Sequence, residues 1–235
     1  MASITATGSD LPQGDDKVRA VRDMFDAIAP RYDLVNRVMT FRMDVGWRRR
    51  AVGSLALPPA SRVVDIACGT GDLCRELASA GLVPIGIDLS VGMLAAARTA
   101  APLVQGDALS LPLRAGTIDG VTCGFGLRNL VALPPFLSEL ARVLRPGGRI
   151  ALLEVATPPN RILRWGHRAY FGRVVPVIGG LLSDGSAYRY LPRSVAYLPA
   201  RGDMRRMIAD AGFVDVDQRL LSAGVAQLIL ATRTW

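Results

Sequence analysis

The stretch Val63–Asp72, VVDIACGTGD, decides the fold of this chain. Its apolar start has the composition of a buried strand, and the two glycines after it allow a tight turn before a helix. Asp65, Gly69 and Gly71 follow the spacing D-x-x-x-G-x-G. Because glycine has no side chain, such a loop lets the backbone approach a ligand closely. The stretch therefore predicts the first unit of a βαβ sheet, with a ligand site at its turn.

Beyond this stretch, apolar runs of strand length alternate with longer amphipathic stretches, which is typical of a parallel sheet. The expected strands are Arg62–Ala67, Val83–Asp88, Leu103–Gly106, Ile118–Gly124, Gly148–Glu154, Phe213–Arg219 and Val225–Thr232, the last two as an antiparallel pair. The expected helices are Asp72–Ala80, Ser90–Thr99, Pro135–Leu144 and Arg201–Ala211. The fold class is therefore α/β and Rossmann-like. It has a mostly parallel seven-stranded sheet, helices on both faces and an antiparallel C-terminal strand.

The chain of 235 residues suits one domain over residues 18–235, preceded by a polar tail, residues 1–17, that we expect to be disordered. Two segments lie outside the regular alternation. Residues 18–55 are helical in pattern and are expected to form an N-terminal lid. Residues 158–199 form an insertion after the fifth strand, and insertions at this edge of such a sheet usually cover the substrate.

Composition excludes several classes of protein. No run of about 18 uncharged apolar residues occurs, so we expect no transmembrane helix. The N-terminus lacks the basic and apolar regions of a secretory signal. Cys68, Cys74, Cys123 and the single histidine, His167, make neither a disulfide framework nor a zinc site, so we expect no metal. We expect three buried cysteines and a reducing, cytoplasmic compartment.

The formal net charge of +8 comes almost wholly from arginine, since Lys17 is the only lysine. One interpretation is a general bias of the proteome towards arginine. The other is attraction to an anionic surface, either lipid headgroups or nucleic acid. Charge alone does not choose between them.

The residues around the glycine loop favour a cationic ligand over a pyrophosphate. A dinucleotide site would carry a third glycine where Cys74 stands, and the acidic Asp65 is unsuited to a phosphate. S-adenosylmethionine carries a sulfonium and an amino group, so Asp65 is placed to lie near its methionine end. This cofactor is the ligand that the loop predicts.

Acidic residues at the ends of the next two strands support a nucleoside cofactor. Asp88 is placed to accept both ribose hydroxyls, and Asp107 to meet the adenine amino group. The alternative is that strand-end aspartates cap helices and form turns. Tyr32 and Asn36, one helical turn apart, form either a lid over the methionine end or plain packing. The expected cofactor residues are Tyr32, Asp65, Gly69, Thr70, Gly71, Asp88, Leu89, Met93, Asp107, Ala108 and Gly124.

Several longer motifs resemble one family. They are MFDAIAPRYDLVNRVMT from Met24, DIACGTGD, IDLSVGML, GDALSLPL, GFGLRN from Gly124, RVLRPGGRIALLE from Arg142 and AYRYLPRSVAYLP from Ala187. Over about nine-tenths of its length the chain resembles the ubiquinone/menaquinone biosynthesis C-methyltransferases. The resemblance implies a class I methyltransferase that methylates the ring of a prenylated quinol, either demethylmenaquinol or a benzoquinol, in respiratory quinone biosynthesis. It departs from many relatives at Asp44, Gly124 and Ile229, which leaves the type of quinone open.

The chemistry that this resemblance implies assigns catalytic roles. A hydroquinone carbon becomes nucleophilic when an adjacent hydroxyl loses its proton. Arg128 and Asn129, just after the fourth strand, are expected to stabilise the resulting phenolate, because arginine stays protonated. A water, Asp26 or Asp44 takes the proton. Tyr188 and the nearby Tyr190 orient the ring, or alternatively pack as aromatic residues.

A prenylated substrate implies contact with a membrane. The segment RILRWGHRAYFGRVVPV from Arg161 mixes basic and aromatic residues, as interfacial helices on anionic lipid do. We expect transient peripheral association with the inner face of the membrane, a surface position for His167, and a homodimer as a possibility. The rival functions are methylation of another lipophilic or phenolic molecule, a non-catalytic scaffold, and nucleic-acid methylation. The last lacks its usual Asn/Asp-Pro-Pro-aromatic motif after the fourth strand, so we expect no nucleic-acid partner.

Overall fold

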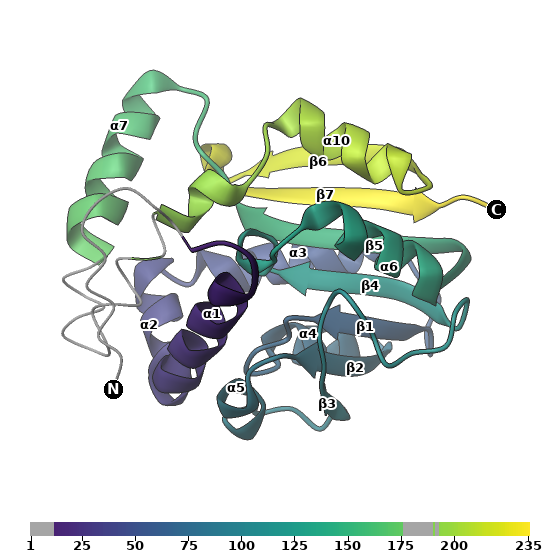
Figure 1. Cartoon of the computed structure of the whole chain (residues 1–235). Coiled ribbons are helices and arrows are strands. Elements are labelled where there is room, and N and C mark those ends of the chain that lie inside the picture. The colour runs from purple at the N-terminus through teal and green to yellow at the C-terminus, as the bar shows by residue number, and fades with distance from the viewer. Residues whose placement is uncertain (1–11, 176–189, 191–192) are drawn as a thin grey trace.

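The computed structural model describes residues 12–175, 190 and 193–235, and shows a seven-stranded sheet flanked by helices (Figure 1). The strand order is β3-β2-β1-β4-β5-β7-β6. Neighbouring strands from β3 to β5 pair in parallel, whereas β7 pairs antiparallel with both β5 and β6. The predicted fold class is therefore confirmed, including the antiparallel strand near the C-terminus.

The strands lie close to their predicted positions. The central strands β1 and β4 are continuously buried, as parallel strands covered on both faces are, whereas β6 is partly exposed. Their bounds are β1 Arg62–Ile66, β2 Val83–Asp88, β3 Leu103–Gln105, β4 Ile118–Gly124, β5 Leu144–Val155, β6 Phe213–Leu221 and β7 Ala226–Arg233. Gly86 lies in the middle of β2, where a Cβ atom would come within 2.6 Å of the Leu103 side chain and 2.8 Å of the Cys68 sulfur. The sheet is thus closely packed where β2 passes behind the glycine loop.

The helices cover both faces of the sheet. Their bounds are α1 Gly14–Ile28, α2 Tyr32–Met39, α3 Met43–Leu55, α4 Asp72–Ser79, α5 Val91–Ala95, α6 Leu133–Val143, α7 Arg161–Ala169 and α10 Arg201–Asp210. Short turns of helix lie at Ala29–Arg31 (η1), Leu127–Asn129 (η2), Tyr170–Val174 (η3, a π-helical turn), Val195–Tyr197 (η4) and Ser222–Gly224 (η5). Helices α6 and α10 cover one face, and α3 and α4 the other.

Three hydrophobic clusters hold these layers together. Phe136 of α6 and Ile208 of α10 pack on one face of the sheet, and Leu55 of α3 and Leu77 of α4 on the other. A third cluster joins α1, α2 and α5, and it includes Val175 from the inserted segment. The two segments outside the βα alternation therefore meet at one end of the sheet. Figure 1 shows α1, α2 and α7 at that end, where the arrowhead of β4 also points.

Three local predictions differ from the structure. The helix expected at Ser90–Thr99 ends at Ala95, because the chain then bends so that the Arg98 N–H donates to the carbonyl of Thr70 in the glycine loop. Strand β5 begins at Leu144, four residues before the predicted start, since Leu144 pairs with Ile118. The tail expected to extend to residue 17 gives way to helix α1 at Gly14.

All three cysteines are buried free thiols, as expected. Among the described residues, no helix has the length and apolar character needed to cross a bilayer.

Candidate active site

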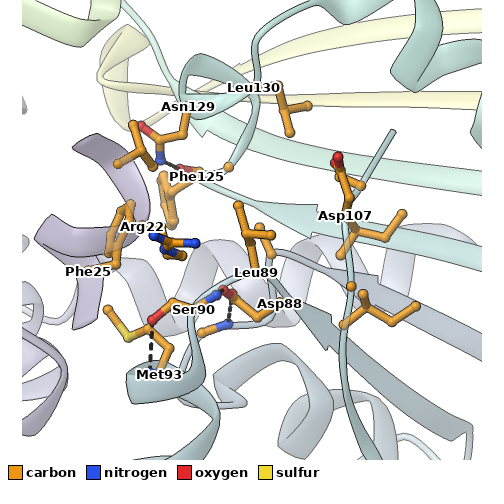
Figure 2. A pocket seen from close by; sticks show the side chains of 18 of the residues that line it. Arg22, Phe25, Asp88, Leu89, Ser90, Met93, Asp107, Phe125, Asn129 and Leu130 are labelled. Atoms are coloured by element: carbon orange, nitrogen blue, oxygen red, sulfur yellow. Dashed lines mark hydrogen bonds between the residues drawn. The ribbon is translucent and has the colours of Figure 1, made fainter. Parts of the chain in front are cut away.

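A cavity opens at the carboxyl ends of β1, β2 and β4, where the strand order reverses between β1 and β4. Open α/β sheets bind ligands at such a switch point because the loops diverge there. The loops after these strands contribute Gly69, Asp88 and Gly124 to the wall, and Phe25 of α1 closes the cavity from outside (Figure 2). We call this space the first cavity.

Asp88 holds two of these loops together. Its carboxylate accepts the backbone N–H of Gly69 at 2.8 Å and that of Ser90 at 2.8 Å. Burial raises the pKa of Asp88, and the two backbone donors oppose that rise by stabilising the charged form. Each carboxylate oxygen has a second lone pair, so Asp88 can also accept a pair of ligand hydroxyls.

Most of the other predicted cofactor residues also line the first cavity. They are Tyr32, Leu89, Met93, Asp107, Ala108 and Gly124. Asp107 lies on the far side from the α1 residue Phe25 (Figure 2), and its carboxylate accepts the Leu109 N–H at 2.9 Å. Leu89 and Met93 provide apolar surface between these two sides. The cavity thus combines an apolar wall for a flat ring with carboxylates for hydroxyl and amino groups.

Asp65 does not line the first cavity. It is 1% exposed, and its carboxylate accepts the Thr122 hydroxyl at 2.8 Å and faces the Cys74 sulfur at 3.7 Å. The next residue, Ile66, lines the cavity instead. Because side chains alternate between the two faces of a strand, Asp65 is turned to the opposite face. The structure therefore places Asp65 behind the cavity wall, and the contact with the methionine end stays a prediction.

Thr70 and Gly71 shape the loop and do not line the first cavity. The Thr70 hydroxyl donates to Asp33 of α2 at 2.5 Å and is buried. Gly71 has a φ of +81°, and a Cβ atom there would come within 2.7 Å of the Thr99 methyl group. Both residues therefore determine where the loop lies, which in turn positions Gly69.

Helix α1 brings residues that the sequence did not point to. Val21, Arg22 and Phe25 line the first cavity, and the Phe25 ring packs edge-on against Tyr32 at a centroid distance of 5.9 Å. Figure 2 shows the Arg22 guanidinium turned into the cavity beside Phe25. A guanidinium in this position can pair with a ligand carboxylate. The helical pattern predicted α1, but only the tertiary contact reveals which loops it covers.

A second, larger cavity of about 780 Å³ meets the first at Tyr32 and Phe125, which line both. Its walls come from α2, α3, α7 and the turns near them, and are mostly apolar: Met39, Phe41, Met43, Trp47, Ile162, Leu163, Trp165, Tyr170 and Phe171. Phe125 has a φ of +60°, and its N–H donates to the Leu153 carbonyl at 2.7 Å. A non-glycine residue in this conformation is uncommon and marks functional sites.

The predicted catalytic residues Arg128 and Asn129 lie at the join between the cavities. Arg128 lines the second cavity, is buried, and forms an ion pair with Glu154 while donating to the Phe125 carbonyl at 2.9 Å. Its Nε atom has no partner within the described part of the chain. Asn129 lines the first cavity and accepts the Tyr190 hydroxyl at 3.4 Å. Tyr188 lies outside the described residues.

The two candidate proton acceptors differ in position. Asp44 lines the second cavity, and its carboxylate accepts the Thr40 hydroxyl at 2.7 Å and two N–H groups of Arg48. Asp26 accepts the Ser90 hydroxyl at 2.5 Å and the Gly92 N–H at 2.8 Å. Asp26 thus joins α1 to α5, whereas Asp44 faces the space that can hold an acceptor.

His167 was expected at the surface, and the structure shows it half-buried. It lines the second cavity, where its ring stacks on Phe171 at a centroid distance of 4.4 Å. Its Nε2 atom is buried with no hydrogen-bond partner among the described residues. Burial lowers the pKa of His167, so the ring is neutral at pH 7. The position of α7 over the cavity, which no sequence pattern shows, places this ring at the cavity wall.

The strand order, with the first cavity at the switch point between β1 and β4, is that of a class I S-adenosylmethionine-dependent methyltransferase. Similar solved folds include phosphoethanolamine N-methyltransferase 2 of Haemonchus contortus with S-adenosyl-L-methionine, at a TM-score of 0.60 and 16% identity, covering 80% of this chain and 52% of that one. Another is a methyltransferase of Thermotoga maritima, at a TM-score of 0.64 and 19% identity, covering 91% and 99%.

The chain belongs to the ubiE/COQ5 methyltransferase family, whose model matches residues 13–233. It is 44% identical to the ubiquinone/menaquinone biosynthesis C-methyltransferase UbiE of Syntrophotalea carbinolica, over 91% of this chain and 94% of the relative. It is 45% identical to the demethylmenaquinone methyltransferase of Thermus thermophilus, over 89% and 100%. The predicted family, enzyme class and cofactor are therefore confirmed.

We expect Asp88→Ala to weaken S-adenosylmethionine binding about 100-fold. Hydrogen bonds to a charged acceptor contribute roughly 1.5–3 kcal/mol each, and the substitution also leaves two loop N–H groups unpaired. Isothermal titration calorimetry measures the effect. The matched control is Asp217→Ala, which removes a half-exposed carboxylate from β6 and should bind like the unmodified protein. Equal affinity in the two variants would contradict the site.

Asp65 predicts an unusual pH dependence of stability. Burial raises its pKa to about 7, although the Thr122 hydroxyl opposes the rise, whereas an unfolded aspartate titrates near ~3.9. Between these values the folded protein binds the extra proton, so its free energy of unfolding falls as the pH rises.

Asp65→Asn removes this titration. From pH 4 to pH 7, the free energy of unfolding of the variant should rise by up to about 4 kcal/mol relative to that of the unmodified protein. One pKa unit corresponds to about 1.4 kcal/mol. Urea unfolding at several pH values measures the difference, with Asp217→Asn, at the half-exposed carboxylate of β6, as control. Parallel profiles for Asp65→Asn and the unmodified protein would show that Asp65 titrates normally.

Proposed function

We propose that this enzyme methylates a ring carbon of a prenylated quinol, either demethylmenaquinol or the benzoquinol equivalent, in respiratory quinone biosynthesis. The observation that carries the proposal is the pair of cavities that share Tyr32 and Phe125. The first cavity suits a nucleoside, and the second cavity suits a large apolar molecule. Relatives at 44% and 45% identity are named for quinone methylation, which supports the same acceptor class.

The residues of the first cavity fit S-adenosylmethionine. Asp88 would accept the ribose hydroxyls, and Asp107 with Ala108 would meet the adenine ring. Arg22 would pair with the methionine carboxylate, and Gly69 allows close approach of the backbone. When bound, the cofactor supplies an electrophilic methyl group. Tyr32 and Phe125 stand at the one place where both cavities are lined by the same side chains.

The acceptor ring requires stabilisation of negative charge on oxygen. Arg128 is fixed by Glu154 and the Phe125 carbonyl, so its guanidinium needs little reorganisation when charge develops. Its buried Nε–H has no hydrogen-bond partner among the described residues. Asn129 adds an amide on the cofactor side. We assign phenolate stabilisation to these two residues, and orientation of the ring to Tyr188.

Asp44 is the better placed proton acceptor of the two carboxylates considered. It faces the second cavity. The Asp26 carboxylate instead accepts two hydrogen bonds, from Ser90 and Gly92, that join α1 to α5. Arg48 holds the Asp44 carboxylate from one side and leaves its Oδ1 to the Thr40 hydroxyl. That hydroxyl provides a path for a proton from the acceptor to Asp44.

The rim of the second cavity supports contact with a membrane surface. Ile162 and Trp165 of α7 are 80% and 75% exposed, and Phe41 on the other side of the cavity is 71% exposed. Arg161 and Arg168 follow the same stripe of α7 as Trp165, because they lie four and three residues from it. Exposed aromatic and basic residues together suit an anionic lipid interface. A prenyl chain could then pass from the bilayer into the cavity.

The second candidate function is methylation of another lipophilic or phenolic molecule, which the apolar lining of the second cavity also favours. Asp44 and Gly124, where many relatives differ, lie on the walls of the two cavities and would set such a preference. Homodimer formation stays a prediction.

Turnover of the acceptor tests the function directly. The protein should methylate a reduced short-chain demethylmenaquinol or its benzoquinol analogue, detected by product mass. Asp44→Asn should lower kcat by about 100-fold with a smaller change in KM, because a positioned base contributes roughly 10²–10⁴. Asp16→Asn, on the exposed face of α1, is the control. If neither reduced acceptor gains a methyl group while the cofactor still binds, the quinol assignment is wrong.

Flotation with anionic vesicles tests the membrane surface. Trp165→Ser should reduce the vesicle-bound fraction several-fold, whereas Trp235→Ser, at a tryptophan that is 98% exposed on the far edge, should not. The double variant Arg161→Ala, Arg168→Ala should reduce the vesicle-bound fraction as Trp165→Ser does. Arg164 is left unchanged, because it donates to the Pro158 and Pro159 carbonyls and supports the start of α7. Equal flotation of the two tryptophan variants would contradict the surface.

A further inference from the structure

Lys17 is the only lysine among 28 basic residues, and it is buried. Only 3% of its surface is exposed, although it lies on the first turn of α1. Burying an ammonium is costly unless the group is well partnered. A buried lysine in a chain that otherwise uses arginine therefore needs a specific reason.

The contacts of Lys17 supply that reason. Its Nζ atom donates to the Leu130 carbonyl at 2.6 Å and lies 3.5 Å from the centroid of the Tyr197 ring. The Tyr197 hydroxyl in turn donates to the Pro12 carbonyl at 2.6 Å. A compact ammonium can sit over a ring and reach a carbonyl at once, whereas a guanidinium is larger and planar.

The partner carbonyl belongs to the wall of the first cavity. Leu130 lines this cavity and directly follows Asn129. On α1, Val21 and Phe25 lie four and eight residues after Lys17, so they share its face of the helix and cover the same cavity. Lys17 thus connects the N-terminal end of this cover to the loop that carries Arg128 and Asn129.

The other end of α1 is attached differently. Asp26 accepts two hydrogen bonds from Ser90 and Gly92, and a Cβ atom on Gly92 would lie 2.9 Å from the Asp26 Cα. Backbone of α5 therefore touches backbone of α1 at this end. At the N-terminal end, one ammonium makes the contact with the cavity wall.

We propose that Lys17 is a positioning residue that holds the N-terminal end of α1 closed over the cofactor, and that the cofactor exchanges when this contact breaks. The proposal rests on the assignment of the first cavity to S-adenosylmethionine. Helix α1 then pivots at Asp26, and opening moves Val21, Arg22 and Phe25 away from the cavity. Closing returns the Leu130 carbonyl to Lys17 and restores the position of the loop after β4.

Amine acylation of the unmodified protein tests this without a mutation. Exposure returns the pKa of Lys17 to the ordinary lysine range of about 10.4, so at about pH 9 the opened amine reacts as an ordinary lysine does, whereas burial shields the closed amine from the reagent. Mass spectrometry follows acetylation of Lys17 with and without saturating S-adenosylhomocysteine. The α-amino group of the chain is the internal reference, which corrects for reagent consumed by the ligand's own amine. The bound ligand should slow Lys17 acetylation at least about tenfold, and an unchanged ratio would overturn the proposal.

Dissociation kinetics provide the second test. Lys17→Met keeps the apolar stem and removes the cation, and should speed S-adenosylhomocysteine release roughly tenfold or more, as expected for loss of a charged hydrogen bond. Arg19→Met removes an exposed cation from the same helix and should leave release unchanged. Equal release rates for Lys17→Met and the unmodified protein would overturn the proposal.

The outcomes distinguish this inference from the proposed function. If the unmodified protein binds S-adenosylhomocysteine but shows neither protection of Lys17 nor faster release in Lys17→Met, only the role of Lys17 is wrong. If calorimetry detects no binding to the unmodified protein, the cofactor site fails, and the role of Lys17 fails with it.

Discussion

The site depends first on the Asp88 carboxylate, which ends β2 and accepts the N–H groups of Gly69 and Ser90. These two bonds place the glycine loop and the loop after β2 side by side at the carboxyl edge of the sheet. A buried carboxylate is stable there because the backbone dipoles of two loops point at it. The same atoms have lone pairs that can accept ligand hydroxyls, so the group that organises these loops also suits a ribose.

Buried ion pairs connect the glycine loop to the wall of the second cavity. Arg48 of α3 pairs with Asp44, on the wall of the second cavity, and with Asp72, at the start of α4 beside the glycine loop. Asp33 of α2 accepts the Thr70 hydroxyl of that loop. The N-terminal helices are therefore fastened to the cofactor loop by charge as well as by packing. These contacts link the walls of the two cavities, which share Tyr32 and Phe125.

Much of the fold was predictable because it follows from local patterns. The glycine loop, the strand-end aspartates and the continuous apolar strands each depend on a few neighbouring residues, and all lie where expected. The departures have physical causes. Asp65 lies behind the wall of the first cavity, since alternation along β1 turns Ile66 inward instead, and its contact with the methionine end stays a prediction. The helix after Ser90 stops at Ala95 because the chain is drawn to Thr70, a contact far away in sequence.

By itself, the sequence determined the class of sheet, the position of the glycine loop and, through its motifs, the family. These features rest on strand periodicity, glycine geometry and short spacings, all of which are local. Only the tertiary structure decided that α1 lines the first cavity, that His167 lines the second cavity and that Lys17 reaches the Leu130 carbonyl. Those contacts join residues separated by up to 113 positions, and they depend on how helices pack against loops across the sheet edge, which no local pattern records.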